Sequence, residues 1–271
     1  MAVREGSGSK VWQRRTPRKK LAIWAGWLFG TAIFVYCFQL ISEKTIWAFV
    51  VDAPAQAMDL GNRMFPPEWG YMSELWRPLW DTINIATLGT AIALVVAVPV
   101  AFLAARNTTP SVAFVRPIAL FVIVSSRSIN SLIWALLLVA IVGPGVFAGI
   151  LAIALRSIGF CAKLLYEAIE EIDENQVEAV SATGAGRAQI LDYGIVPQIL
   201  PAFAGITVFR WDINIRESTV VGLVGAGGIG LELNAQIMDL GWASVAVILI
   251  AILSTVLVSE WVSAKVRHAI I

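Results

Sequence analysis

The sequence has few of the residues that make a protein soluble or metal-binding. Only 14% of its 271 residues are charged, against about 25% in soluble domains. It has one histidine, His268, and two cysteines, Cys37 and Cys161, without the spacing of metal ligands. The net charge of +1 is too small for the basic footprint of a nucleic-acid-binding protein. We therefore expect no metal, no disulfide and no nucleic-acid partner.

The sequence also lacks the loop that holds nucleotide phosphates, because no G-x-x-x-x-G-K-[ST] pattern occurs in it. The stretch GLVGAGGIGLE does contain the dinucleotide-binding spacing G-x-G-x-x-G. However, apolar runs flank this stretch, and no acid follows about 20 residues later to bind a ribose. We expect no cofactor bound by this chain. The glycines, which allow turns and close helix contact, are interpreted as an external gate or hinge: Gly225, Gly227, Gly228 and Gly230.

Long apolar runs are what the sequence has instead. A helix needs about 20 mostly apolar residues to cross a bilayer. Six segments have that length: 21–41, 83–105, 118–142, 146–166, 201–222 and 242–262. The predicted fold is an all-α integral membrane protein with six transmembrane helices. The predicted parts are a basic tail at 1–20, a first transmembrane helix at 21–41, an outer interfacial segment at 42–80 and a five-helix core at 81–265.

Basic residues indicate the orientation of these helices. Lysines and arginines crowd the tail before the first run, where Glu5 is the only acid. The positive-inside rule places this tail in the cytoplasm. Six crossings return the C-terminus, with Lys265 and Arg267, to the same side. We therefore expect a multi-pass protein of the cytoplasmic membrane with both termini in the cytoplasm.

The segment 42–80 is too polar to cross the membrane and too aromatic for a free loop. We expect one or two amphipathic helices on the outer interface, in contact with lipid and broken at Pro54 and at the pair Pro66 and Pro67. This segment is interpreted as a brace at the membrane surface.

Charged residues inside the apolar runs indicate function, because each costs at least about 2.5–3.5 kcal/mol at mid-membrane. Arg127 lies about 13 Å into its run, at about 1.5 Å per residue, and has no acid nearby in that run. In the fifth run, Arg210 and Glu217 fall on one helix face, and Asp212 and Arg216 fall on nearly the opposite face. Two interpretations stay open: the charges form structural ion pairs, or at least one arginine binds an anion.

The second interpretation predicts a polar substrate passage, since a guanidinium binds a tetrahedral oxyanion through two parallel hydrogen bonds. The expected passage residues are Arg127, Arg216, Ser218, Thr219, Ser125, Ser126 and Asn130. Arg156 and Lys163 are expected near the cytoplasmic side, with Glu167 as a partner one turn away. No residue is assigned a catalytic role.

The longest predicted cytoplasmic segment lies at about 170–200 and reads EAIEEIDENQVEAVSATGAGRAQILDYGIVPQILP. Its acids, small residues and glycines predict a solvated helical hairpin that turns at Gly184 and Gly186. Small residues on one face of its first helix allow another protein to approach closely.

This segment resembles the signature of ABC importer permeases, which is EAA, three residues, Gly, nine residues and I-x-L-P. The matching positions are Glu178, Ala179, Gly184 and Pro197. The departures from the pattern are Val180, Gly194 and Val196. The resemblance implies a coupling helix that docks in a cleft of a cytoplasmic ATPase subunit, which holds ATP and Mg²⁺.

Further stretches, namely EAIEEID, VFRWDINIREST, VVGLVGAGGIG and SSRSINSLIWALLLVAIVGPGVFAGILAIAL, resemble the permease subunit of phosphonate importers over about 75–265. The resemblance implies a type I ABC importer permease fold, like that of methionine importers. It also implies a homodimer of two permease copies, two ATPase subunits and an extracytoplasmic phosphonate-binding protein. The expected function is passage of phosphonate, with phosphate and phosphate esters as further cargo, by alternating access, and no enzymatic activity.

The sequence leaves three alternatives open. A permease of the same fold could carry another small solute, such as methionine or phosphate, because methionine permeases share the glycine stretch and the loop. A passive anion channel would need no ATPase. A membrane-bound enzyme could hold a metal between Glu170 and Glu174, which are four residues apart.

Overall fold

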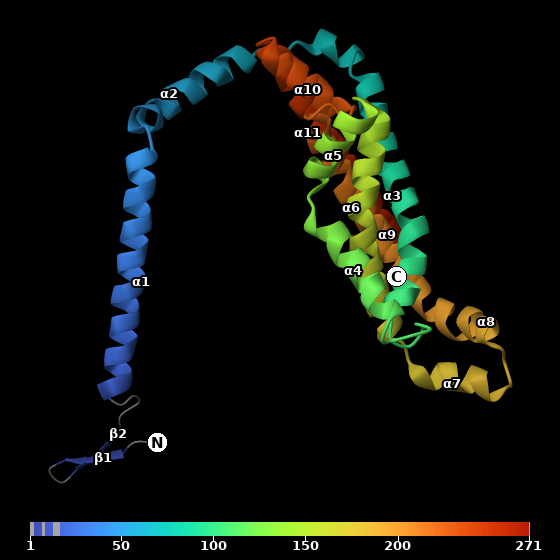
Figure 1. Ribbon diagram of the computed structural model, residues 1–271. Coiled ribbons are helices and arrows are strands. Elements are labelled where there is room, and N and C mark those ends of the chain that lie inside the picture. The colour runs from blue at the N-terminus through green and yellow to red at the C-terminus, as the bar shows by residue number, and fades with distance from the viewer. Residues whose placement is uncertain (1–2, 7–8, 13–16, 271) are drawn as a thin grey trace. The chain divides into compact units, whose positions relative to one another are not determined.

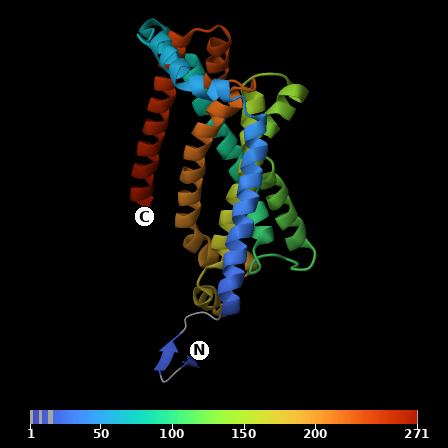
Figure 2. The same cartoon turned by 90° about the vertical axis from the view of Figure 1, so that its left-hand side faces the viewer.

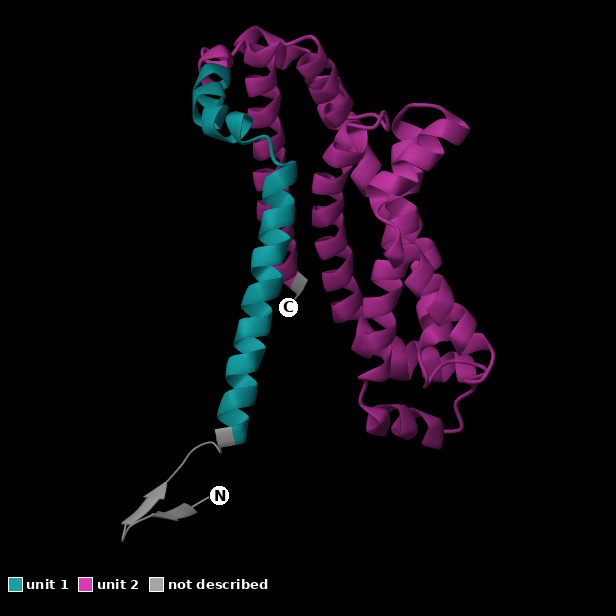
Figure 3. Ribbon diagram, turned by 60° about the vertical axis from the view of Figure 1, so that its left-hand side comes forward, with its two compact units in different colours: residues 1–60 teal, residues 61–271 magenta. Residues whose placement is uncertain are grey.

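A computed structural model describes residues 3–6, 9–12 and 17–270 (Figure 1). Apart from two short strands, the regular structure of these residues is helical, as the sequence predicted. The chain divides into two compact units, residues 1–60 and 61–271, which Figure 3 colours separately.

The first unit begins with a hairpin and continues into a long apolar helix. Strands β1 (Val3–Gly6) and β2 (Ser9–Trp12) pair antiparallel. The sequence had predicted no strands in the tail at 1–20. Helix α1 (Pro17–Lys44) contains the predicted run 21–41 and extends beyond it at both ends. Its 28 residues span about 42 Å at about 1.5 Å per residue, which is more than the hydrocarbon core of a bilayer.

Helix α2 (Trp47–Met64) follows and runs through Pro54 without a break. The predicted break at Pro54 is wrong. A proline inside a helix removes one backbone hydrogen bond and crowds the carbonyl four residues earlier, and here the remaining bonds of the helix continue past it. The helix ends at Met64, next to Pro66 and Pro67.

The second unit is a bundle of helices (Figures 1 and 2). Its elements are the 3-10 helix η1 (Trp69–Ser73), α3 (Trp76–Ala104), α4 (Val115–Ser128), α5 (Ser131–Val142), α6 (Val146–Glu170), α7 (Glu174–Ala182), α8 (Arg187–Ile190), the π-helix η2 (Leu191–Ile195), α9 (Val196–Gly222), α10 (Ile229–Met238) and α11 (Trp242–Ile270). Helices α3, α6 and α9 pack against one another. Helices α4 and α5 pack on α6, and α11 packs on α9.

Five helices of the described residues are long and apolar enough to cross a membrane, and a sixth crossing follows if the bent pair α4 and α5 is one span. The expected single helix at 118–142 is wrong, because α4 and α5 meet at 87°. Ile129 is extended, and the Asn130 side chain caps α5 by accepting a hydrogen bond from Leu132 N at 3.1 Å. This cap starts a new helix inside the apolar run.

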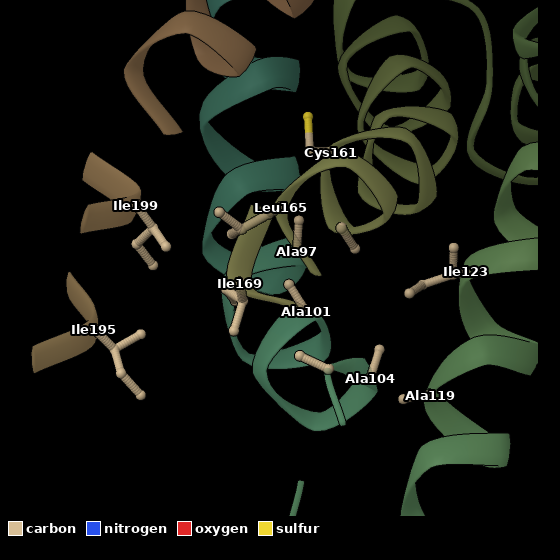
Figure 4. Close-up of a cluster of buried hydrophobic side chains, with 12 residues drawn as sticks. Ala97, Ala101, Ala104, Ala119, Ile123, Cys161, Leu165, Ile169, Ile195 and Ile199 are labelled. Atoms are coloured by element: carbon tan, nitrogen blue, oxygen red, sulfur yellow. The ribbon is translucent and has the colours of Figure 1, made fainter. Parts of the chain in front are cut away.

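Small side chains bring the central helices close together. Figure 4 shows one buried cluster, in which Ala97, Ala101 and Ala104 of α3 lie near Leu165 and Ile169 of α6. Two turns earlier in α3, a Cβ atom at Gly89 would lie 2.9 Å from Ile153 Cγ2 of α6. Alanine and glycine at these positions let the two backbones pack without a layer of bulky side chains between them.

The two ends of the second unit are built from different elements. We call the end with α7 and α8 the hairpin end, and the end with η1, α10 and the stretch Gly222–Gly230 the glycine end. They lie at opposite ends of the bundle (Figure 1). Helix α9 runs from one to the other.

Candidate functional site

Helix α9 carries a polar cluster on each of two faces. One face meets α3 and α6, and another meets α11. We call the first the α6 cluster, and its members are Thr90, Arg156, Ser157, Arg210, Asn214 and Glu217. We call the second the α11 cluster, and its members are Asp212, Arg216, Ser259 and Glu260. Arg210 and Glu217 are therefore separated from Asp212 and Arg216, as the helical spacing predicted.

The α6 cluster is built around a buried arginine. The Arg210 side chain is 2% exposed, and its Nη2 lies 3.2 Å from Glu217 Oε2. Its Nε donates to Ser157 Oγ at 2.9 Å. Asn214 Nδ2 donates to the same Ser157 oxygen at 3.1 Å and to Thr90 Oγ1 at 2.7 Å. The buried charge thus has a hydrogen-bonded counter-ion, without which its burial would cost several kcal/mol.

Glu217 is shared between two arginines. Its Oε1 lies 3.7 Å from Nη1 of Arg156, while its Oε2 faces Arg210. The same Arg156 nitrogen donates to Asn130 Oδ1 at 3.1 Å and lies 3.4 Å from Ser131 Oγ. Arg156 therefore connects the start of α5 with α9.

This position differs from the one expected for Arg156. The sequence paired Arg156 or Lys163 with Glu167 near the cytoplasmic side, and only Lys163 makes that pair, at 3.5 Å. The prediction for Arg156 is wrong because its acid is Glu217 of α9, which is distant in the sequence. An arginine in the middle of an apolar run with no acid in the adjoining turns was the signal that could have identified it.

Arg127 lies just before the bend between α4 and α5 and is exposed. Among the described residues, its guanidinium has no ion pair and no hydrogen bond. Its aliphatic part lies against α6, where a side chain at Gly159 would be 2.9 Å from Arg127 Cγ. Ser126 fixes this contact, because its Oγ accepts a hydrogen bond from Gly159 N at 2.9 Å and donates to Leu155 O. Asn130 thus contacts Arg156, whereas Ser126 and the aliphatic part of Arg127 contact α6 at Gly159.

The α11 cluster has the opposite balance of charge. Asp212 pairs with Arg216 and also accepts a hydrogen bond from Ser259 Oγ at 2.8 Å. Arg216 Nη1 lies 3.8 Å from Glu260 Oε1. Two acids and one arginine leave this cluster with one net negative charge. This geometry favours the structural ion pair over anion binding for Arg216.

The hydroxyl candidates lie in different places. Ser218 is fully buried, and its Oγ donates to Ile215 O of its own helix at 2.7 Å. Thr219 lies at the glycine end, where its carbonyl approaches Gly230. Ser125 is half-buried on α4. The structure therefore does not join Ser218 or Thr219 to the residues around Arg127.

The glycine-rich stretch is tightly packed and buried. A side chain at Gly222 would lie 2.5 Å from Gly227 O, and one at Gly230 would collide with Thr219 O. Ile229 N donates to Thr82 Oγ1 of α3 at 2.8 Å. Positive φ angles occur at Gly225, Gly227 and Gly228. These glycines therefore allow turns and close contact, and their role as a gate stays a prediction.

Polar side chains connect η1 with α10 and α11 at the glycine end. The Tyr71 hydroxyl donates to the Glu232 carboxylate and accepts from Gln236 Nε2 at 3.1 Å. Ser244 Oγ donates to Glu68 Oε2 at 2.7 Å. Burial and the neighbouring Glu232 carboxylate raise the pKa of Tyr71, so its hydroxyl keeps the proton that it donates.

The hairpin end consists of α7, a turn and α8. The Asp173 side chain caps α7 by accepting from Asn175 N at 3.0 Å. Gly184 turns the chain with a φ of +81°. Glu178 and Ala179 are exposed on α7. A hollow of about 650 Å³ is lined by Ala179, Val180, Thr183, Gly184, Ala185, Gln189 and Tyr193.

Gln198 in the first turns of α9 holds this hairpin to the bundle. Its Oε1 accepts from Asp173 N at 2.9 Å, and its Nε2 donates to Gly194 O at 2.6 Å. Gly194, which departs from the permease signature, lies against α7, where a side chain would be 3.5 Å from Val177 Cα. Pro197 is exposed beside it at the start of α9.

The proposed metal pair is not formed. Glu170 accepts from Arg106 N at 2.9 Å and pairs with Arg116 at 3.3 Å, which ties the α3–α4 loop to the end of α6. Glu174 begins a different helix, α7. In the part of the chain that the structure describes, no three His, Cys, Asp or Glu side chains group as a metal ion requires. The geometry gives no support to the membrane-enzyme alternative.

Known proteins resemble this chain in sequence and fold. Residues 97–268 match the family described as binding-protein-dependent transport system inner membrane component. The phosphite transport system permease protein of Stutzerimonas stutzeri is 42% identical over 240 residues, which cover 89% of this chain and 86% of that protein. The phosphate-import permease protein of Mycolicibacterium smegmatis is 38% identical over 222 residues, which cover 82% of this chain and 42% of that protein.

Among solved structures, a chain of an inward-facing methionine ABC transporter has a TM-score of 0.66 at 22% sequence identity. The match covers 75% of this chain and 99% of that chain. At this identity the likeness concerns the fold, and it agrees with the methionine-importer-like architecture predicted from the sequence.

Proposed function

We propose that the chain is the transmembrane permease of an ATP-driven importer of small phosphorus oxyanions. It belongs to the family of binding-protein-dependent transport system inner membrane components. Phosphite and phosphonate are the first cargoes to consider, and phosphate is the next. The observation that carries this proposal is the identity with named phosphite and phosphate-import permeases over most of the chain.

The charges near the bend of α4 and α5 suit such a cargo. Arg156 and Arg210 against Glu217 give the α6 cluster a net charge of +1, and Arg127 adds a further cation on α4, which packs on α6. Phosphorus oxyanions carry up to two negative charges near neutral pH, and arginine binds them with two parallel hydrogen bonds. Arg127 is the leading passage residue, since it has no counter-ion among the described residues. Ser126, beside it, lines the same passage in this proposal.

The other passage candidates have weaker support. Asn130 accepts from Arg156 and so belongs to the same region. Ser125 is near Arg127 only along the helix. Arg216 is paired, and Ser218 and Thr219 lie nearer the glycine end of α9.

The energy for transport comes from a separate subunit in this proposal, because the sequence has no P-loop. The α7–α8 hairpin docks on that ATPase, which binds ATP and Mg²⁺. Glu178, Ala179 and Gly184 are exposed for this contact, and Pro197 lies next to it. Docking at an exposed hairpin held to α9 by Gln198 couples ATP hydrolysis to alternating access of the bundle.

The proposed assembly has two copies of this chain around a two-fold axis, two ATPase subunits and an extracytoplasmic binding protein that delivers the oxyanion. The family description itself names dependence on a binding protein. The hairpin end and both termini face the cytoplasm. The glycine end then faces outward, and its tightly packed glycines act as the external gate: Gly225, Gly227, Gly228 and Gly230.

Uptake of radiolabelled phosphite into proteoliposomes that hold the complete transporter tests this function. We expect that uptake requires ATP and the binding protein. Unlabelled phosphonate should compete with the labelled phosphite, and methionine should not. Glu178→Lys should reduce uptake to background while the chain still inserts, because the change reverses a charge on the exposed hairpin. Glu43→Lys, the same reversal near the end of α1, is the matched control and should retain uptake.

Each alternative predicts a different result in this experiment. Competition by methionine without competition by phosphorus oxyanions would assign the chain to another cargo. Uptake without ATP would indicate a passive channel. Full uptake by Glu178→Lys, with the ATPase subunit still bound, would contradict the role of the hairpin.

A further inference from the structure

Arg156 uses only one edge of its guanidinium to bind the protein. Its contacts with Asn130 Oδ1, Ser131 Oγ and Glu217 Oε1 all involve Nη1. Across the described residues, no partner is found for its Nε or Nη2. The side chain is 31% exposed, against 2% for Arg210. The free Nε–Nη2 edge presents two parallel N–H groups, the arrangement that binds an oxyanion at two points.

The counter-ion of Arg156 is held more firmly by another arginine. Glu217 Oε2 accepts a hydrogen bond from Arg210 at 3.2 Å, whereas Oε1 lies 3.7 Å from Arg156. A separation of 3.7 Å is too long for a hydrogen bond. If Arg156 leaves Glu217, the carboxylate keeps Arg210 as its partner and no buried charge is left unpaired. Arg156 can therefore turn towards a ligand at low cost, and Arg210 cannot.

Arg156 lies one turn along α6 from the position that contacts Arg127, the leading passage residue. Gly159 lies three residues after Arg156 on the same face of α6, and it contacts the aliphatic part of Arg127. Asn130, which accepts from Arg156, follows Arg127 at the bend between α4 and α5. The two arginines thus flank the same bend in the bundle.

We propose that Arg156 binds the transported oxyanion, and that the bound oxyanion replaces Glu217 as the counter-ion of the Arg156 guanidinium. This inference rests on the proposed function. The oxyanion takes the Nε–Nη2 edge of Arg156. Glu217 stays on Arg210 while the oxyanion is bound. When the oxyanion leaves, Glu217 neutralises Arg156 again. This exchange keeps binding in the passage weak, because the empty site is already partly neutralised.

The KM and kcat of phosphite uptake by proteoliposomes with the complete transporter test this role. Arg156→Gln should raise KM about 10- to 100-fold, as expected when a charge-assisted contact is lost. Lys163→Gln is the matched control, because it removes the same charge about two turns later on α6, from an ion pair with Glu167. It should leave KM within about twofold.

A second variant separates substrate binding from a structural role. Arg156→Lys keeps a positive charge beside Glu217 but lacks the two-point edge, so it should assemble normally and raise KM about three- to tenfold. A purely structural arginine would instead lower the amount of assembled transporter or kcat with KM unchanged. An unchanged KM in Arg156→Lys therefore overturns the proposal. If wild-type vesicles take up no phosphite, the proposed function itself fails, which is a distinct result.

Discussion

The two polar faces of helix α9 use the same chemistry with opposite charge balance. On the α6 face, two arginines share one glutamate, and on the α11 face, two acids share one arginine. A charge inside an apolar run therefore does not by itself mark a ligand site. The number of partners decides whether a cation is left for an anion, and only the α6 face leaves a net positive charge.

The two faces also differ in burial. The Arg210 side chain is 2% exposed and the Arg216 side chain is 46% exposed. Water can therefore solvate Arg216 when its acid is removed, but it cannot reach Arg210. The same substitution should have unequal effects on the two faces.

The largest expected difference between the two faces is in the free energy of unfolding when the acid of each face is removed. Glu217→Ala should lower the free energy of unfolding by about 3–5 kcal/mol, because it leaves Arg210 charged and buried without a counter-ion. Asp212→Ala should cost about 1 kcal/mol, because exposed Arg216 keeps Glu260 and water. Unfolding in mixed detergent micelles measures both values. Equal losses would show that the two faces do not differ in burial as described.

The next largest difference between the two sides of α9 is expected in the KM of transport. Arg127→Gln, on helix α4 that packs on α6, should raise the KM of phosphite uptake about tenfold or more, because the cation has no protein counter-ion among the described residues. Arg216→Gln, on the α11 face, should change KM less than about twofold, since its charge is already paired. A larger change in KM for Arg216→Gln than for Arg127→Gln would reverse the assignment of the passage to the α6 side.

The smallest expected difference is in the stability lost when one serine on each face is replaced. Ser157 Oγ accepts from both Arg210 and Asn214, whereas Ser259 Oγ donates to Asp212. Ser157→Ala should cost about 1–3 kcal/mol, because both Arg210 and Asn214 lose a buried partner, and Ser259→Ala should cost about 1 kcal/mol, because only Asp212 loses one. Thermal unfolding of the two purified variants in the same detergent compares them. A greater loss for Ser259→Ala would contradict the ranking of the faces.

Much of the fold could be predicted because apolar length and helical spacing are local properties. The spacing of Arg210, Asp212, Arg216 and Glu217 was enough to assign them to two faces. The bend at Ile129 and Asn130 was not predicted, since a continuous apolar run hides a cap residue inside it. Asn130 before Ser131 is a helix-start signal, but the length of the apolar run outweighs this signal in a prediction from the sequence. The strands of the tail carry no strong alternation that would have revealed them.

The site could be predicted only in part, because it depends on contacts between distant helices. The sequence predicted that Arg127 has no acid nearby in its own run, and that the segment at about 170–200 forms a helical hairpin; their roles in transport stay predictions. The pairing of Arg156 with Glu217 joins α6 to α9 across a long stretch of sequence, and no local pattern indicates it. Which edge of the Arg156 guanidinium stays free is a property of the packing alone.

Helix α9 has a mechanical consequence, because it runs unbroken from Gln198 at the hairpin to Gly222 in the packed glycines. Its 27 residues form a stiff rod about 40 Å long. Tilting such a rod by about 5° about one tip moves the other tip by about 3.5 Å. A small displacement of the hairpin end would therefore move the glycine end as well, and the side chains of both polar clusters would move with the helix.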